Sequence, residues 1–403
     1  MNRFESLSGK ALLFLSFIWL LWFLNFTGRT IFSPILPLLE DEFHVSHAKA
    51  SSIAALISIG YACSVFFSGI FSRLFGAKKA IVISLMVTAC IYLCLPFVKN
   101  FNTIYFFGFF LGLTTGMYIP NIIPIITEYY EERVWGRVIS IHDSAASMSI
   151  FGAPFVALFF LSFVSWRTMF ALLAIAYIVC GVVFALKVEG LKTEGKKKFI
   201  QADLLKNKAL WLTGIIWIFA AGANLGLYFI IPLYLTKELG VPIAQANATF
   251  GFSRLGGVIV SIAAGFFADR FSLKKTTIVL LIATGILTIL VAIGDVRWIR
   301  LILFLQASIA TGFFPISLVT ISKMFSREER GQATGFVLAF GSVFGIGIVP
   351  YLLGISGDLV SFRVGILALG ILTALSSLLV IPLRDSPQMT RKGRAPETSA
   401  TRR

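Results

Sequence analysis

The sequence GFFADRFSLKK, from Gly265 to Lys275, matches an earlier stretch, GIFSRLFGAKK, from Gly69 to Lys79, at five of eleven positions. The two stretches are 196 residues apart, and the same offset aligns four more regions, among them Pro154 with Pro350. A single offset that recurs in five separate regions indicates an internal duplication. The sequence therefore predicts two halves that share one fold and one orientation.

Long apolar segments fill both halves. Of the 403 residues, 57% are hydrophobic and only 13% are charged, whereas soluble domains carry about 25% charged residues. Runs of about 20 apolar residues can cross a bilayer, and they must be helices to satisfy their backbone hydrogen bonds. The alternation typical of a membrane β-barrel is absent. We predict an all-α membrane protein with twelve transmembrane spans, at residues 11–38, 48–72, 80–98, 103–127, 138–163, 167–187, 209–235, 244–268, 275–293, 298–322, 333–356 and 363–383.

The distribution of basic residues predicts the topology. A formal net charge of +16 would suggest a nucleic-acid partner in a soluble protein. Here the loops on one side of the predicted membrane hold 26 Lys and Arg residues, and those on the other side hold 7. The positive-inside rule then places both termini in the cytoplasm. We expect a multi-pass protein of a bacterial inner (plasma) membrane, embedded in the lipid bilayer and without a nucleic-acid partner.

The predicted spans divide the chain into four parts. We expect an N-terminal six-helix bundle over residues 1–187 and a C-terminal six-helix bundle over 209–383. A basic cytoplasmic linker, 188–208, which contains three consecutive lysines, would join them. The tail, 384–403, is rich in Pro, Thr and Arg, a composition typical of disorder.

The loop from Gly265 to Lys275 resembles the loop signature of the major facilitator superfamily, G-x-x-x-D-R-x-G-x-K/R-K/R, and it falls between predicted spans eight and nine. The earlier copy departs from that signature, since Arg73 stands where the acidic residue is expected. Parallel halves are described for this superfamily. The resemblance implies the superfamily's fold of two six-helix bundles and a secondary transporter that acts by alternating access.

Charged residues in these loops form a predicted cytoplasmic gate. Asp269 can hold the positive end of a neighbouring helix, and the start of span five, near Arg137, is the expected partner. Together with Arg73 and Arg270, this contact would latch the cytoplasmic ends of the two halves. The alternative interpretation is that these charges only anchor short loops.

Two arginines, Arg29 and Arg254, lie inside predicted spans. A charge in hydrocarbon costs about 3 kcal/mol or more, so it is normally kept inside the bundle. The two residues come from different halves and would lie near the midplane, where transporters built from repeats bind substrate. Since Arg binds carboxylate and phosphate through paired hydrogen bonds, we predict that both hold an anionic substrate. The alternative is a structural role, with each guanidinium paired to carbonyls or to a neighbouring helix.

Other polar residues interrupt the apolar spans. His142 and Asp143 open span five, and a histidine titrates near neutral pH. Two interpretations of this pair stay open: a proton-coupling site, or a gate pair that holds Arg137 or Arg73. Six further residues are predicted to line the substrate cavity with the arginines: Asn25, Tyr118, Asn121, Asn224, Tyr228 and Gln306.

These features favour one function and leave two alternatives. We predict a monomeric secondary active transporter of a small organic anion, such as a carboxylate, driven by proton symport or by exchange. A multidrug or metabolite exporter of the same fold would tolerate the loss of both arginines, and a non-transporting membrane receptor would show no flux. The sequence holds no Walker-type loop and no nucleophile elbow, so no enzymatic activity and no cofactor are expected. The scattered histidines and cysteines imply no metal site.

Overall fold

The computed structural model describes residues 4–189, 202–326 and 329–383. The predicted tail, 384–403, and the centre of the predicted linker, 190–201, lie outside the described residues. The regular elements of the described part are helices, of the α form, the tighter 3₁₀ form or the wider π form. This agrees with the predicted all-α fold.

The first half contains long and short helices. Its elements are α1 (Lys10–Thr30), α2 (Phe32–Phe43), α3 (His47–Ser51), α4 (Ile53–Phe75), α5 (Ala77–Cys94), η1 (Leu95–Phe97), α6 (Phe101–Gly116), α7 (Tyr118–Tyr129), η2 (Glu132–Val134), α8 (Trp135–Leu161) and α9 (Trp166–Lys187).

In the described part of the second half, two spans contain π-helical turns. Its elements are α10 (Ala202–Leu205), α11 (Lys208–Ala221), η3 (Gly222–Gly226), α12 (Leu227–Leu233), η4 (Tyr234–Glu238), α13 (Ile243–Ser253), α14 (Leu255–Arg270), α15 (Leu273–Ile293), η5 (Val296–Trp298), α16 (Ile299–Met324), α17 (Arg330–Phe340), η6 (Gly341–Ile348), α18 (Val349–Leu359), α19 (Phe362–Ser376) and η7 (Ser377–Val380).

In the described part of the chain, 11 helical stretches are long and apolar enough to cross a membrane. The predicted eighth span, 244–268, is formed by two helices, α13 and α14, and Arg254 is the single residue between them. Gly256 and Gly257 follow this division, and helices bend readily at such small residues. A Cβ atom at Gly256 would lie 2.0 Å from the Ser308 hydroxyl, so the close packing against α16 requires glycine there. Arg254 therefore lies where α13 meets α14, within the predicted span.

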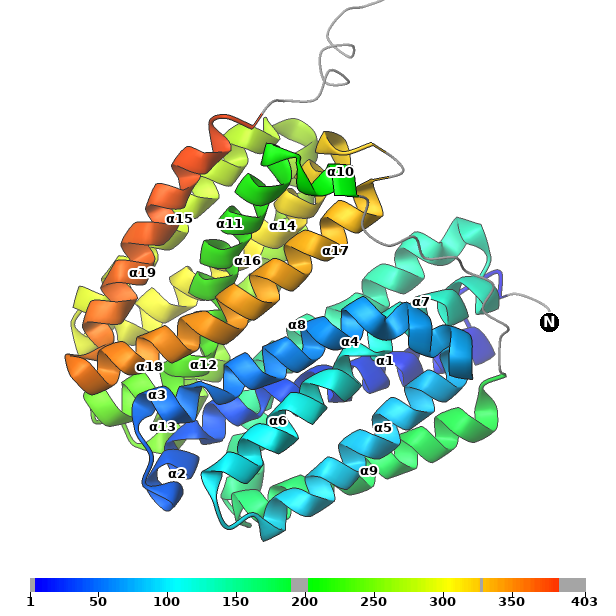
Figure 1. Ribbon diagram of the computed structural model, residues 1–403, viewed down its shortest axis with the longest axis horizontal. Coiled ribbons are helices and arrows are strands. Elements are labelled where there is room, and N and C mark those ends of the chain that lie inside the picture. Colours follow the sequence, from blue (N-terminus) through cyan, green and yellow to red (C-terminus); the bar gives the residue numbers. More distant parts are fainter. Residues whose placement is uncertain (1–3, 190–201, 327–328, 384–403) are drawn as a thin grey trace, which may run out of the picture.

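The duplication is visible in matching contacts. Figure 1 shows α1 to α9 gathered in one bundle and α11 to α19 in the other. Glu42, at the end of α2, accepts hydrogen bonds from the Trp166 indole (2.5 Å) and the Arg167 guanidinium at the start of α9. Glu238, which follows Glu42 by the repeat offset, accepts a hydrogen bond from the Phe362 N–H (2.6 Å) at the start of α19. Each carboxylate thus ties the first span of its half to the sixth, which confirms the predicted repeat.

The two halves meet at one end of the molecule, which we call the closed end. There α3 packs against α18, α2 against α12, and α13 against α8. From this end the ribbons of the two halves diverge towards the opposite end, where the N-terminus and α10 lie (Figure 1). The halves are therefore in contact towards one side of the membrane plane.

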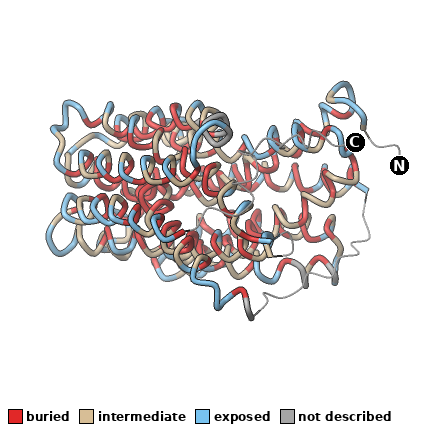
Figure 2. The backbone as a smooth tube through the Cα atoms, turned by 90° about the horizontal axis from the view of Figure 1, so that it is seen from above, coloured by how far each residue is buried: buried red, intermediate tan, exposed pale blue. Residues whose placement is uncertain are grey.

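The outer surface is apolar. Figure 2 shows buried residues on the inward faces of the helices and exposed residues on the outward faces. Large apolar side chains are among the exposed ones, including Phe159 (62% exposed), Leu186 (76%) and Ile259 (70%). Such exposure is unfavourable in water but suits contact with lipid, as expected of a multi-pass membrane protein.

Candidate functional site

Arg254 lies in a polar and aromatic environment inside the second half, where it is 6% exposed. Its Nη1 donates a hydrogen bond to Asn224 Oδ1 (3.0 Å). The guanidinium carbon lies 5.0 Å from the centre of the Tyr228 ring and 5.6 Å from that of Phe250. The Nε atom is buried without a hydrogen-bond partner among the described residues. Since buried donors are nearly always paired in folded proteins, this unpaired N–H is unusual.

Asn224 owes its position to the π-helical turn Gly222–Gly226 (η3). Such turns are frequent at functional sites, because they widen the helix and redirect side chains. Gln306 supports this turn by donating a hydrogen bond to one of its backbone carbonyls (2.8 Å). The Nδ2 of Asn224 lies 3.3 Å from the Thr311 hydroxyl, to which it donates. That contact orients the Oδ1 of Asn224 towards Arg254.

Arg29 lies in an aromatic environment in the first half, near the division between α1 and α2 at Ile31. Its guanidinium carbon is 4.2 Å from the centres of both the Phe26 and Tyr61 rings, which is the range of a cation–π contact. Its Nε atom is buried without a hydrogen-bond partner in the described part of the chain. Like Arg254, it connects the first and second spans of its own half.

Two buried tyrosines hold the backbone beside Arg29. The Tyr92 hydroxyl donates to the Gly28 carbonyl (2.5 Å), and the Tyr177 hydroxyl donates to the Leu24 carbonyl. A Cβ atom at Gly28 would lie 2.7 Å from the Tyr92 hydroxyl oxygen, so this approach requires glycine. Tyr92 and Tyr177 therefore fix the backbone of α1 beside Arg29, and both tyrosines belong to the same half as Arg29.

A contact between the halves joins the two arginine environments. Tyr228, whose ring lies beside Arg254, accepts a hydrogen bond through its carbonyl from the Ser33 hydroxyl (2.8 Å). Ser33 follows Arg29 by about one helical turn. The Tyr228 hydroxyl is itself buried without a hydrogen-bond partner among the residues that the structure describes. Arg29 and Arg254 therefore lie on either side of one inter-half contact.

Most of the remaining predicted lining residues have partners inside one half. The Asn121 carbonyl oxygen accepts a hydrogen bond from the Ser72 hydroxyl (2.6 Å). The Tyr118 hydroxyl donates to a backbone carbonyl of α1 (2.9 Å), and Gln306 supports η3. Asn25 donates to the Thr115 carbonyl (3.3 Å), but its own Oδ1 is buried without a partner in the described regions. Beside the two arginines, Asn25 and Tyr228 are thus the predicted lining residues with a buried polar atom that has no partner in the described part of the chain.

His142 and Asp143 point to different surroundings. His142 is 1% exposed, and its ring stacks on those of Trp22 and Tyr118, with centres 6.0 Å and 5.9 Å away. Its Nε2 lies 3.3 Å from the Tyr118 hydroxyl oxygen. Asp143, by contrast, is exposed. The two side chains therefore differ in exposure, and their roles in proton coupling or gating stay predictions.

The predicted cytoplasmic gate is described only in part. Arg137 and Arg270 are exposed. The side chains of Arg73 and Asp269 lie outside the described residues. The contacts proposed for this gate therefore stay a prediction.

Sequence reasoning missed a group of polar contacts that joins the halves at the closed end. The Asp358 carboxylate, on α18, accepts hydrogen bonds from the N–H groups of His47 (2.8 Å) and Ala48 (2.9 Å) at the start of α3. Lys237 forms an ion pair with Asp41. These last two residues are separated by 196 positions, so they occupy equivalent positions in the two halves.

The chain also matches a known family over nearly its whole length. The model of the Major Facilitator Superfamily matches residues 18–293 and 227–402. The chain belongs to the Major Facilitator Superfamily. Because the matched ranges include both halves, the resemblance seen in the loop from Gly265 to Lys275 is confirmed for the whole bundle.

Relatives within the Major Facilitator Superfamily include transporters and a sensor. The hexuronate transporter of Bacillus subtilis (strain 168) is 22% identical over 64% of this chain and 64% of its own length. The 4-hydroxybenzoate transporter PcaK of Acinetobacter baylyi is 23% identical over 79% of this chain and 80% of its own. The membrane sensor protein UhpC of Escherichia coli (strain K12) is 22% identical over 92% of this chain and 91% of its own.

A solved structure shares the fold of this superfamily member. It is a bacterial homologue of the human lysosomal transporter Spinster in an inward-facing and occupied conformation, with a TM-score of 0.77 and 14% sequence identity. The similarity covers 92% of this chain and 96% of that one. The predicted fold is therefore confirmed, independently of the substrate.

Proposed function

We propose that the protein is a secondary active transporter of a small organic anion, a carboxylate, across the inner membrane. Arg29 and Arg254 hold the anion, one from each half. The observation that carries this proposal is that each guanidinium lies among aromatic rings and keeps a buried Nε without a partner in the described part of the chain. A carboxylate would accept these free N–H groups, and its single negative charge would offset one of the two buried positive charges.

The named relatives support a carboxylate. Hexuronate and 4-hydroxybenzoate, which appear in the names of two of the transporters, are both carboxylates. Such a substrate presents two oxygens in the plane that a guanidinium fork requires. Aromatic rings around Arg29 and Arg254 would then contact the apolar part of the anion.

The arrangement of the halves suggests how binding drives transport. With both termini in the cytoplasm, the closed end faces the periplasm, and the conformation corresponds to an inward-facing state. Two cations in a site of low dielectric repel each other, and an anion between them reverses the sign of that interaction. Binding therefore favours approach of the halves around the anion, and release lets them separate. Transport is coupled to proton symport or to exchange, with His142 and Asp143 as candidates for the proton carrier or the gate.

Uptake into proteoliposomes tests the proposal. Purified wild-type protein should accumulate a labelled carboxylate, and glucuronate and 4-hydroxybenzoate are the first probes. Arg29→Ala and Arg254→Ala should each reduce the uptake rate by at least about tenfold, as expected for the loss of a charge-assisted pair. Arg297→Ala is the matched control, because the Arg297 side chain is 85% exposed and pairs with Asp295 outside the site. Uptake of neutral solutes alone, unchanged in both site variants, would contradict the proposal and favour an exporter or carrier of neutral compounds.

A receptor is the second candidate function, favoured by the similarity to the membrane sensor UhpC over most of both chains. A sensor would bind the anion through the same arginines but carry no flux. Thermal stabilisation by a carboxylate, lost in Arg254→Ala, combined with no uptake under a proton gradient or in exchange mode, would identify a receptor.

A further inference from the structure

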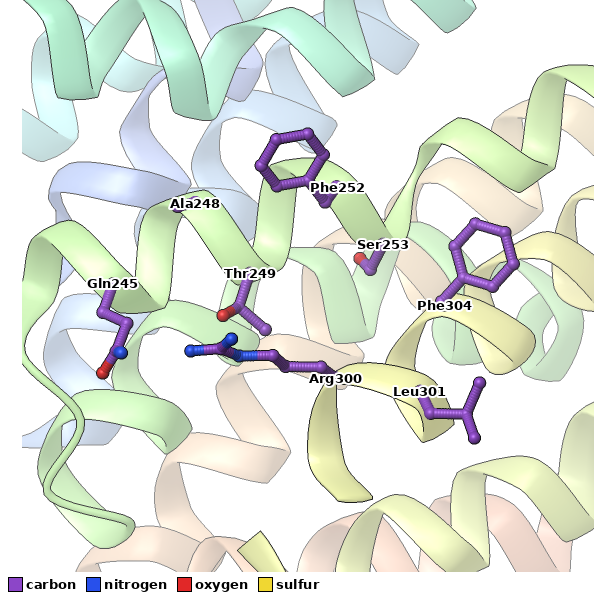
Figure 3. Close-up of a pocket in the computed structure, with 8 residues that line it drawn as sticks. All are labelled: Gln245, Ala248, Thr249, Phe252, Ser253, Arg300, Leu301 and Phe304. Carbon is purple, nitrogen blue, oxygen red and sulfur yellow. The ribbon is translucent and has the colours of Figure 1, made fainter. Parts of the chain in front are cut away.

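A groove lies between α13 and α16 on the outward side of the second half. It encloses a volume of about 380 Å³, which is within the range of small-molecule binding sites. Its lining residues come from both helices, as Figure 3 shows: Gln245, Ala248, Thr249, Phe252, Ser253, Arg300, Leu301 and Phe304.

The groove has a polar part and an apolar part. The Arg300 guanidinium extends along α13 towards Gln245 and Thr249, whereas Leu301 and Phe304 lie on the other side of it (Figure 3). Arg300 is exposed, and none of the eight lining residues is acidic. Among the apolar residues, Leu301 is 49% exposed and Phe304 is 37% exposed. A ligand that fits must combine a negative group with an apolar chain.

The position of Arg300 along its helix corresponds to the headgroup region of a membrane. It lies in the first turn of α16, two residues after Trp298, which is 62% exposed. Tryptophan is enriched at membrane interfaces, and arginine near a helix end extends its charge to the same level. Phe304 lies one turn deeper, about 6 Å further into the bilayer. The polar part of the groove is therefore at headgroup depth and the apolar part at acyl-chain depth.

We propose that a glycerophospholipid from the leaflet at the closed end occupies this groove. Its phosphate binds Arg300 beside Thr249 and Gln245, and one acyl chain lies against Leu301 and Phe304. A soluble phosphate compound would fill only the polar part and leave apolar side chains exposed. A phospholipid matches both parts at once, and the bilayer supplies it at high local concentration.

Occupation of the groove would affect the contact between the halves, because α13 also packs on the first half. The Phe252 ring, which lines the groove, lies 5.0 Å from the Phe155 ring of α8. Asn247 of α13 donates a hydrogen bond to the Pro34 carbonyl of α2 (3.2 Å). A Cβ atom at Gly251 would lie 2.5 Å from the Phe155 ring of α8. A lipid in the groove therefore supports the helix that closes the halves and ends at Arg254. We expect bound phospholipid to stabilise the closed end.

Lipid titration of the full-length protein in detergent tests this proposal. The protein is first stripped of lipid, and phosphatidylglycerol is then added. The Tm is measured at each lipid concentration, and native mass spectrometry counts the lipid molecules bound to the protein. Two partial probes separate the contributions: inorganic phosphate lacks the chains, and diacylglycerol lacks the phosphate. Arg300→Gln removes the charge in the groove. Arg297→Gln is the control, because this exposed arginine lies one turn away and pairs with Asp295.

Phosphatidylglycerol should raise the Tm and form a one-lipid adduct in the wild type and in Arg297→Gln. In Arg300→Gln the lipid concentration needed for half the effect should increase roughly tenfold, as expected for loss of a charge-assisted hydrogen bond. Equal responses of the two variants would overturn the proposal. Full stabilisation by inorganic phosphate alone would also overturn it, because the ligand would then be a soluble phosphate compound. Full stabilisation by diacylglycerol alone would overturn it as well, because Arg300 would then have no role in binding.

Discussion

Replacement of Asp358 by Ala should open the closed end. The Asp358 carboxylate accepts two hydrogen bonds across the halves, of 2.8 Å from the His47 N–H and 2.9 Å from the Ala48 N–H. Loss of such a helix cap costs about 0.5–2 kcal/mol, and hydrogen bonds to a charged group contribute about 1.5–3 kcal/mol. Because Asp358 is exposed, we expect a loss of about 1.5 kcal/mol. The loss applies only when the halves touch, so the ratio of closed to open molecules should fall roughly tenfold.

The distance between the halves at the closed end is the quantity to measure. Phe97, in the first half, and Trp298, in the second, are 80% and 62% exposed, and both lie in connections at the closed end. Spin labels on cysteines at these positions report the distance by pulsed electron paramagnetic resonance. The native cysteines are replaced first; they are Cys63, Cys90, Cys94 and Cys180.

Asp295→Ala is the matched control. Its carboxylate also accepts a backbone hydrogen bond at a helix start, from the Arg297 N–H (2.8 Å), but within one half. It should leave the distance distribution unchanged, whereas Asp358→Ala should populate longer distances. A distribution in Asp358→Ala that matches the wild type would show that this cap does not hold the halves together.

Three further predictions concern packing and ion pairs. Gly285→Ala should lower the Tm, because the new Cβ would lie 2.6 Å from a backbone carbonyl of α19 and such overpacking costs about 1–3 kcal/mol. The control, Gly335→Ala, should leave the Tm unchanged, since nothing lies within 4 Å of its new Cβ. Equal Tm values for the two variants would refute this packing. Tyr92→Phe should lower the free energy of unfolding by about 1 kcal/mol. It should also weaken anion binding, because the backbone beside Arg29 loses a hydrogen bond. Unchanged anion binding by calorimetry would show that Tyr92 does not position Arg29. Lys237→Ala should open the closed end less than Asp358→Ala does, since a partly exposed ion pair contributes only about 0–1 kcal/mol. The same spin-label distance measures both effects, and a larger shift in Lys237→Ala than in Asp358→Ala would contradict this prediction.

The bundle architecture could be predicted from the sequence because the bilayer imposes it. A span must be long and apolar whatever its neighbours, so hydropathy alone located most helices. The duplication added the relation between the halves, and Glu42 and Glu238 show that equivalent residues make equivalent contacts. Arg29 and Arg254 could be identified as unusual for the same reason, since a charge in an apolar span needs a special environment.

Other features could not be predicted, because they depend on contacts between distant residues. A hydropathy window averages over the junction of α13 and α14 at Arg254 and over the π turn Gly222–Gly226 that presents Asn224. The cap from Asp358 to α3 joins residues about 310 positions apart, and no local pattern marks it. The partners of Gln306, Ala223 and Thr288, likewise lie far from it in the sequence.

Anion binding by the single and double variants of Arg29 and Arg254 tests the central claim most directly. Isothermal titration with a transported carboxylate gives the affinity for the wild type, Arg29→Ala, Arg254→Ala and the double variant. If both guanidinium groups hold the same anion, each single change should weaken binding at least about tenfold, and the coupling energy should be about 1 kcal/mol or more. Strictly additive effects, or a change below about twofold in either single variant, would show that the two arginines do not share one ligand.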